Sequence, residues 1–121
     1  MSAKKILFIH IPKTGGISIQ SHPFFKESIQ NLGHSLVNDQ DFSENNKYDT
    51  IFTIVRNPYS RLVSAYFYLK KGGMENKLDL SYQKILEPYD TFDSFVTHIK
   101  KKPEFINEIL HMVPQVDFIY D

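Results

Sequence analysis

The sequence predicts an α/β fold in which helices flank a parallel β-sheet. Two apolar runs support this class, at residues 5–11 and 50–55. Both are rich in β-favouring side chains and lack the alternation of a half-exposed strand, which is typical of strands covered on both faces. Each run also ends abruptly in residues that suit a turn or a helix start, at Pro12 and at Asn57. We therefore expect two buried strands that each lead into a helix.

Composition limits what the chain can be. Its 121 residues give room for one domain with one core. Lys plus Arg equal Asp plus Glu at 14 each, so no overall charge recruits nucleic acid or a membrane surface, and an anion site must be built locally. The absence of cysteine excludes disulfides and thiolate metal ligands. Because no stretch suits a bilayer span and no secretory pattern opens the chain, we expect a cytoplasmic protein.

The turn after the first apolar run has the composition of a phosphate-binding loop. Gly15 and Gly16 allow the backbone to turn tightly and to approach a ligand. The N–H groups that open the next helix form an anion site, to which Lys13 adds a cation and Thr14 and Ser18 add hydroxyls. In the common nucleotide loop the lysine follows the last glycine, whereas Lys13 precedes both. An ordinary turn with a solvated lysine therefore remains an alternative.

The segment between the two apolar runs predicts a helix and a short strand. A helix is expected to begin after Gly16 and to kink at Pro23, because proline disfavours α geometry at the residue before it. Residues 23–32 can place apolar side chains on one side of a helix, and Gly33 suits its C-terminal end. A short strand is predicted at residues 35–37.

The second apolar run leads into the helix with the clearest limits. Asn57 is a good N-cap, Pro58 suits the first helical position, and two glycines at residues 72–73 should end the helix. The predicted core-facing stripe consists of apolar residues at helical spacing: Tyr59, Leu62, Val63, Tyr66 and Phe67.

The last third of the sequence predicts a loop followed by helices. Residues 74–90 are polar and weakly periodic, so we expect a long loop with one helical turn near residues 82–86. Thr91 can cap a further helix, and Pro103 can open another. Residues 118–120 are predicted to enter a strand.

Basic and hydroxyl side chains follow both predicted strands. Lys13, Thr14 and Ser18 come after the first, and Arg56 and Ser64 come after the second. Because the carboxyl ends of parallel strands meet at one edge of a sheet, where ligands bind, these groups imply a ligand with two separated anionic groups. A surface ion pair for Arg56 and a solvated position for Ser64 are the alternatives.

The two motifs resemble those of a known enzyme family. Residues 12–18 resemble the 5′-phosphosulfate loop, and residues 56–66 resemble the 3′-phosphate motif, of sulfotransferases that use 3′-phosphoadenosine 5′-phosphosulfate (PAPS). The nearest branch contains heparan sulfate 2-O-sulfotransferase, other carbohydrate sulfotransferases and short bacterial relatives. The similarity covers residues 5–66 and, more weakly, residues 114–119. The resemblance implies a P-loop-type fold with PAPS as the sulfate donor. We expect no metal, because the histidines lack ligand spacing and the chain has no cysteine.

The resemblance also implies roles for single residues. Lys13 would contact the bridging oxygen of the phosphosulfate, and Arg56 and Ser64 would hold the 3′-phosphate. His34 matches the element that supplies the catalytic base in the uronyl 2-O-sulfotransferases, and imidazole titrates near neutrality; His10 is the second candidate. The 5′-phosphate cradle would consist of Thr14, Gly15, Gly16, Ile17 and Ser18.

These features predict transfer of a sulfuryl group from PAPS to a hydroxyl of a carbohydrate. The alternative is a non-catalytic or truncated nucleotide-binding module that retains both loops. Family domains usually continue further, whereas this chain ends at Asp121, so we expect a single P-loop domain over residues 1–121 that lacks the usual C-terminal third. Such a domain leaves apolar surface and an open sheet edge, which predicts a homo-oligomer.

Overall fold

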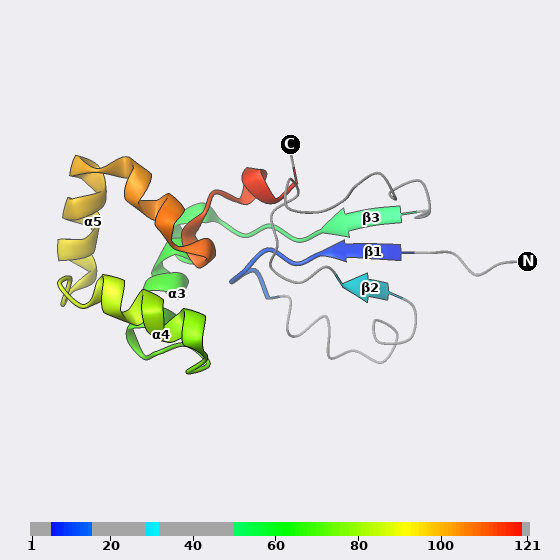
Figure 1. The fold of residues 1–121 in the computed structure, drawn as a ribbon. Coiled ribbons are helices and arrows are strands. Elements are labelled where there is room, and N and C mark those ends of the chain that lie inside the picture. Colours follow the sequence, from blue (N-terminus) through cyan, green and yellow to red (C-terminus); the bar gives the residue numbers. More distant parts are fainter. Residues whose placement is uncertain (1–5, 16–28, 32–49, 120–121) are drawn as a thin grey trace, which may run out of the picture. The chain divides into compact units, whose positions relative to one another are not determined.

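The computed structural model describes residues 6–15, 29–31 and 50–119. These residues belong to two compact units (Figure 1). The sheet unit spans Met1–Arg56 and Pro114–Asp121 and holds a parallel β-sheet. The helical unit spans Asn57–Val113. The chain is therefore α/β, as predicted from the sequence. Within the described residues, no helix has both the length and the apolar character needed to cross a membrane.

The sheet has three described strands in the order β2-β1-β3. β1 (Ile6–Ile9) pairs in parallel with β2 (Ile29–Asn31) on one side and with β3 (Thr50–Thr53) on the other. The arrows of all three point the same way in Figure 1, so their carboxyl ends lie at one edge. Both strands predicted from apolar runs are confirmed, and β1 is buried as expected, but Thr50 and Ile51 of β3 are exposed, so the predicted burial of the second strand is wrong at its start.

Packing and one hydrogen bond tie β1 to β3. Phe8 is fully buried, and its ring centroid lies 5.0 Å from that of Phe52 on β3. The hydroxyl of Thr53 donates to the carbonyl of Ile9 at 2.6 Å. The carboxyl ends of the two strands are therefore held together where the candidate loops begin.

β2 corrects one prediction. Residues 23–32 were expected to form a helix, but residues 29–31 form a strand that pairs with β1. A partner strand that offers its backbone groups outweighs the weak helical preference of so short a segment. The strand predicted at residues 35–37 lies outside the described residues and stays a prediction.

α3 (Pro58–Lys70) begins and ends as predicted. The Asn57 side chain accepts hydrogen bonds from the backbone N–H groups of Tyr59 and Ser60, and Pro58 occupies the first turn. Positive φ angles of 95° and 59° at Gly72 and Gly73 follow the last turn.

The buried face of α3 differs from the predicted stripe. Tyr59 is 80% exposed and Phe67 is 50% exposed, whereas the small Ala65 is fully buried. Tyr66 is part of the predicted stripe and also of the observed buried face, where its ring stacks on that of Phe95 with centroids 5.2 Å apart. Spacing alone does not decide which flank of Tyr66 is buried, since that depends on the helices that pack against it. The buried residues are Arg61, Ala65, Tyr66 and Leu69.

α4 (Lys77–Leu86) includes the helical turn predicted near residues 82–86 but begins earlier, where a loop was expected. The many polar residues of this segment did not predict a helix. A helix-start signal is nevertheless present, because the side chain of the N-cap Asn76 accepts a hydrogen bond from the N–H of Asp79, three residues later. α5 (Phe92–Lys101) is confirmed, with a reciprocal capping box between Thr91 and Ser94.

The chain then continues in short 3₁₀ helices. η3 (Pro103–Glu108) begins at the predicted proline, and η4 (Leu110–Met112) follows. η5 (Gln115–Phe118) corrects the strand predicted at residues 118–120, because Phe118 closes a 3₁₀ turn instead. The core of the helical unit consists of Ala65, Tyr66, Leu69, Tyr82, Leu86, Phe95, Phe105, Ile109 and Met112.

Candidate functional site

The loop after β1 has an unusual backbone at its predicted cation. Lys13 has φ of +64°, although it is not glycine. A non-glycine residue in this region costs about 1–3 kcal/mol and persists only where neighbouring contacts hold it. One such contact is close by: the buried hydroxyl of Thr14 donates to the carbonyl of Ile11 at 2.8 Å. The loop therefore keeps a strained conformation at the residue assigned to the ligand.

Gly15 is required for its backbone angle rather than for space. Its φ is +88°, yet a Cβ placed there would meet nothing within 4 Å. The residue is also exposed, so the main chain at this point is open to an approaching ligand. The rest of the predicted cradle, Gly16, Ile17 and Ser18, lies outside the described residues, and its role stays a prediction.

Arg56 extends the site from the end of β3. Its Nη1 donates to the carbonyl of Lys13 at 3.3 Å, so the structure brings together two residues that lie far apart in the sequence. The Arg56 side chain is exposed, and a guanidinium carries several N–H donors, of which this bond uses one. The end of β3 and the loop after β1 therefore meet at the same edge of the parallel sheet, and each of them carries a cationic residue.

Gln115 joins this group and was missed by the sequence reasoning. Its Oε1 accepts from the Arg56 N–H at 2.7 Å, and its Nε2 donates to the Arg56 carbonyl at 2.7 Å. The available signal was weak: residues 114–119 resemble the family, but nothing in the sequence links Gln115 to a residue 59 positions earlier.

The remaining predicted residues are placed differently. Ser64 is half-buried on α3 in the helical unit, and its joint action with Arg56 stays a prediction. His34 lies outside the described residues. His10, the second candidate base, is 6% exposed and stacks on Phe8 at 5.6 Å between ring centroids, which fits packing better than proton exchange with a substrate.

Arg61 acts as a structural residue. Its side chain is 4% exposed, and Nη1 donates to the Val113 carbonyl at 2.7 Å within the helical unit. Burial lowers the pKa of Arg61 to about 10, so the guanidinium is still charged at neutral pH.

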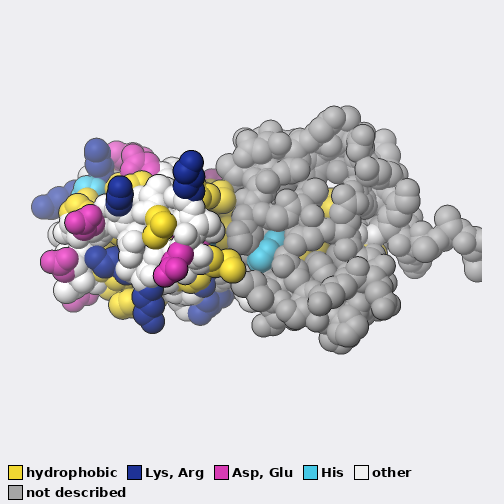
Figure 2. Space-filling view, turned by 60° about the horizontal axis from the view of Figure 1, so that its bottom comes forward, with side chains coloured by type: hydrophobic (Ala, Val, Ile, Leu, Met, Phe, Trp, Pro, Cys, Tyr) yellow, Lys and Arg dark blue, Asp and Glu magenta, His cyan; other side chains and the backbone are white. Residues whose placement is uncertain are grey.

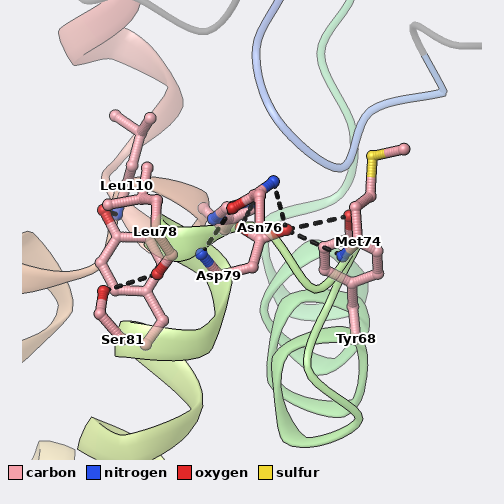
Figure 3. Close-up of polar contacts among 9 residues, drawn as sticks. Tyr68, Met74, Asn76, Leu78, Asp79, Ser81 and Leu110 are labelled. Carbon is pink, nitrogen blue, oxygen red and sulfur yellow. Dashed lines mark hydrogen bonds and ion pairs between the residues drawn. The ribbon is translucent and has the colours of Figure 1, made fainter.

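A second polar cluster lies inside the helical unit around Asp79 (Figure 3). The Asp79 carboxylate accepts from the Met74 N–H at 3.0 Å, the Asn76 amide at 3.3 Å and the Tyr68 hydroxyl at 3.4 Å. His111 Nε2 lies 3.6 Å from the other carboxylate oxygen.

Asp79 and His111, at the centre of the cluster, are buried. Asp79 is 3% exposed and His111 is 6% exposed, and the rings of Tyr68 and Tyr82 pack against the imidazole with centroids 5.7 Å away. Burial, the charge of Asp79 and the hydrogen bond to it raise the pKa of Tyr68, in that order of importance. The cluster holds the turn between α3 and α4 in place. Among the residues that the structure describes, no three metal-ligating side chains are grouped to hold an ion.

On the face shown in Figure 2, the surface of the helical unit has no large patch of only positive or only negative side chains. Acidic and basic side chains alternate there with apolar ones, in keeping with the equal charge counts of the sequence.

Comparison with known proteins gives one match. The family model described as the sulfotransferase family matches residues 2–120. No curated protein and no solved structure shows significant similarity to the chain.

Proposed function

Because this chain belongs to the sulfotransferase family, we propose that it transfers a sulfuryl group from PAPS to a hydroxyl of an acceptor, and that the acceptor is a carbohydrate. The observation that carries the proposal is the contact between Arg56 and Lys13. It brings the Arg56 side chain against the main chain of the loop that carries Lys13, at the carboxyl edge of a parallel sheet, where ligands of α/β proteins bind.

The charges of PAPS suit these residues. The donor carries a phosphosulfate at the 5′ position and a phosphate at the 3′ position, and arginine and lysine are the usual partners of such groups. Under this proposal the β1 loop is a P-loop-type turn in which Lys13 faces the phosphosulfate. The buried Thr14 hydroxyl, predicted from the sequence as a ligand donor, instead donates to the Ile11 carbonyl and holds the loop. Arg56, with Ser64, recognises the 3′-phosphate.

The reaction needs alignment, charge stabilisation and removal of one proton. The acceptor oxygen forms a bond to sulfur while the bond from sulfur to the bridging oxygen breaks. The electron pair stays on that oxygen, which becomes part of the product 3′-phosphoadenosine 5′-phosphate (PAP). The Lys13 ammonium stabilises the charge there, and the acceptor proton passes to a base, which we assign to His34.

A nucleotide titration tests the site. PAP and AMP differ by the 3′-phosphate, so Arg56→Ala should weaken binding of PAP far more than that of AMP. Lys84→Ala removes an exposed lysine on α4 and is the matched control, with both affinities unchanged. Equal losses for PAP and AMP in Arg56→Ala would contradict the assignment of Arg56.

Turnover tests the activity itself. Full-length protein incubated with radiolabelled PAPS and a panel of carbohydrates should transfer label to one of them. Binding of PAP by a protein that transfers no label to any hydroxyl acceptor would support the nucleotide-binding module instead.

A further inference from the structure

Gln115 makes an unusual pair of hydrogen bonds, because both reach the main chain of one residue. Its side-chain amide accepts from the N–H of Arg56 and donates to the carbonyl of Arg56, each at 2.7 Å. Two opposed residues exchange the same pair of bonds in an antiparallel ladder. The ladder between β1 and β3 ends at Thr53, so Gln115 holds the chain beyond the point where strand pairing stops.

These two bonds hold the main chain of Arg56, and the main chain determines where the guanidinium can reach. When the N–H and the carbonyl of one residue are both held, its φ and ψ are constrained, and with them the direction of the Cα–Cβ bond. From this position Nη1 reaches the carbonyl of Lys13 at 3.3 Å. Lys13 is the residue with φ of +64° in the β1 loop. Hydrogen bonds therefore connect η5 to the β1 loop through Arg56.

We propose that Gln115 is a positioning residue of the nucleotide site. It holds Arg56 so that the guanidinium stays beside the Lys13 loop and is already oriented when an anionic group of the nucleotide arrives. Arg56 is exposed, and an exposed arginine loses rotational freedom when it binds a ligand. Fixing its main chain beforehand removes the backbone part of the ordering cost, and the bond from Nη1 to the Lys13 carbonyl restrains the side chain. This inference rests on the proposed function and adds a residue to it.

The competing interpretation is that Gln115 merely attaches η5 to the sheet unit. A double-mutant cycle separates the two, because a residue that acts through Arg56 loses its effect when the Arg56 side chain is absent. PAP affinity is measured by calorimetry for the full chain as wild type, Gln115→Met, Arg56→Ala and the double variant. Methionine keeps the length of the side chain and removes the amide.

Gln115→Met should weaken PAP binding by about tenfold in the wild-type background, as loss of one or two hydrogen bonds implies. In the Arg56→Ala background the same change should alter affinity by less than about twofold. Gln83→Met is the matched control, since Gln83 Nε2 donates to the Lys70 carbonyl at 3.0 Å in the helical unit. That variant loses the same type of bond and should bind PAP as the wild type does.

Gln115→Glu provides a second variant if the methionine variant fails to fold. It keeps an acceptor for the Arg56 N–H but, when ionised, turns a second acceptor toward the Arg56 carbonyl. Protonation restores the donor, so its PAP affinity relative to wild type should recover as the pH falls toward the ordinary glutamate pKa of about 4.3. The same cycle with Arg56→Ala applies to it.

The outcomes are distinct. Equal losses on changing Gln115 in both backgrounds, in a protein that binds PAP, overturn the positioning role and leave the proposed function intact. Failure of the wild-type protein to bind PAP overturns the proposed function, and the positioning role with it. A loss confined to the background that contains Arg56 supports the proposal.

Discussion

The sheet unit and the helical unit place their polar side chains in opposite settings. In the sheet unit, Arg56 is exposed and Lys13 is half-buried, and the hydrogen bond between them uses a main-chain carbonyl. In the helical unit, Asp79 and His111 are buried, and the carboxylate is surrounded by donors from Tyr68 and from the turn before α4. The Arg56 cation is open to solvent, whereas the Asp79 carboxylate is enclosed.

This difference shows that residue type alone does not identify a site. A carboxylate, an imidazole and a phenol in contact are typical of catalytic centres, and the Asp79 cluster contains all three. Its carboxylate already accepts three hydrogen bonds, and a substrate cannot reach a group that is 3% exposed. Arg56 of the sheet unit is exposed, and its guanidinium carries N–H donors beyond the one that bonds to the Lys13 carbonyl. Variants of the two units should therefore affect different properties.

The largest effect is expected from Lys13→Ala in the sheet unit. Removing a cation that stabilises a leaving group should lower kcat by roughly 10²–10³-fold, while the free energy of unfolding changes by less than about 1 kcal/mol. Steady-state transfer from PAPS and urea unfolding measure the two quantities, with Lys84→Ala as the control. Normal turnover in Lys13→Ala would break the comparison, because the strained loop would then have no catalytic purpose.

The sequence predicted the parts of the fold that local signals specify. β1 and β3 follow apolar runs, and α3 and α5 begin at an Asn-Pro pair and at a threonine cap. β2 and the buried face of α3 depend on partners distant in the sequence, and α4 lacks a strong apolar stripe, so periodicity did not reveal them. The site shows the same division. Lys13 and Arg56 were predicted from two motifs, whereas Gln115 depends on a hydrogen bond that only folding creates.

Asp79→Ala should have the next largest effect, and on stability. The variant leaves the donors from Met74, Asn76 and Tyr68 without their buried acceptor, which costs about 2–4 kcal/mol in the free energy of unfolding. Urea unfolding measures the loss, and Glu108→Ala, an exposed acidic residue in the same unit, should stay within about 0.5 kcal/mol of wild type. PAP affinity of the folded variant should be unchanged. A normal unfolding free energy would show that the cluster does not stabilise the helical unit.

Alanine substitutions at two glycines, one in each unit, should destabilise the protein by smaller amounts. Gly73 has φ of +59°, and a Cβ there would lie 2.7 Å from Cγ of Asp79, so Gly73→Ala combines backbone strain with a clash in the core. Gly15 has φ of +88° and no atom within 4 Å of such a Cβ. We expect thermal unfolding to report about 2–3 kcal/mol of destabilisation for Gly73→Ala and about 1 kcal/mol for Gly15→Ala. Equal losses would mean that the Asp79 side chain moves aside without cost.

The smallest effect concerns the pH dependence contributed by Tyr68. Its pKa is raised from 10.0 by burial first and then by Asp79, so the folded state holds the phenolic proton more tightly than the unfolded chain. The stability that Tyr68 contributes is therefore fully present below about pH 10 and is lost as the pH rises through the folded pKa.

Tyr68→Phe removes this titration together with a hydrogen bond to Asp79. The variant should be less stable than wild type by about 0.5–1 kcal/mol at neutral pH, and the difference should shrink as the pH rises above about 10. Arg61, whose lowered pKa of about 10 acts in the opposite sense, and Tyr66, whose pKa is raised by burial, are common to both proteins and cancel in the difference. Urea unfolding of both proteins at a series of pH values between neutrality and about pH 11 measures it. A difference in stability that stays constant across that range would show that Tyr68 has the same pKa in the folded and unfolded chains. Burial and the Asp79 carboxylate would then not raise the pKa of Tyr68 as the structure implies.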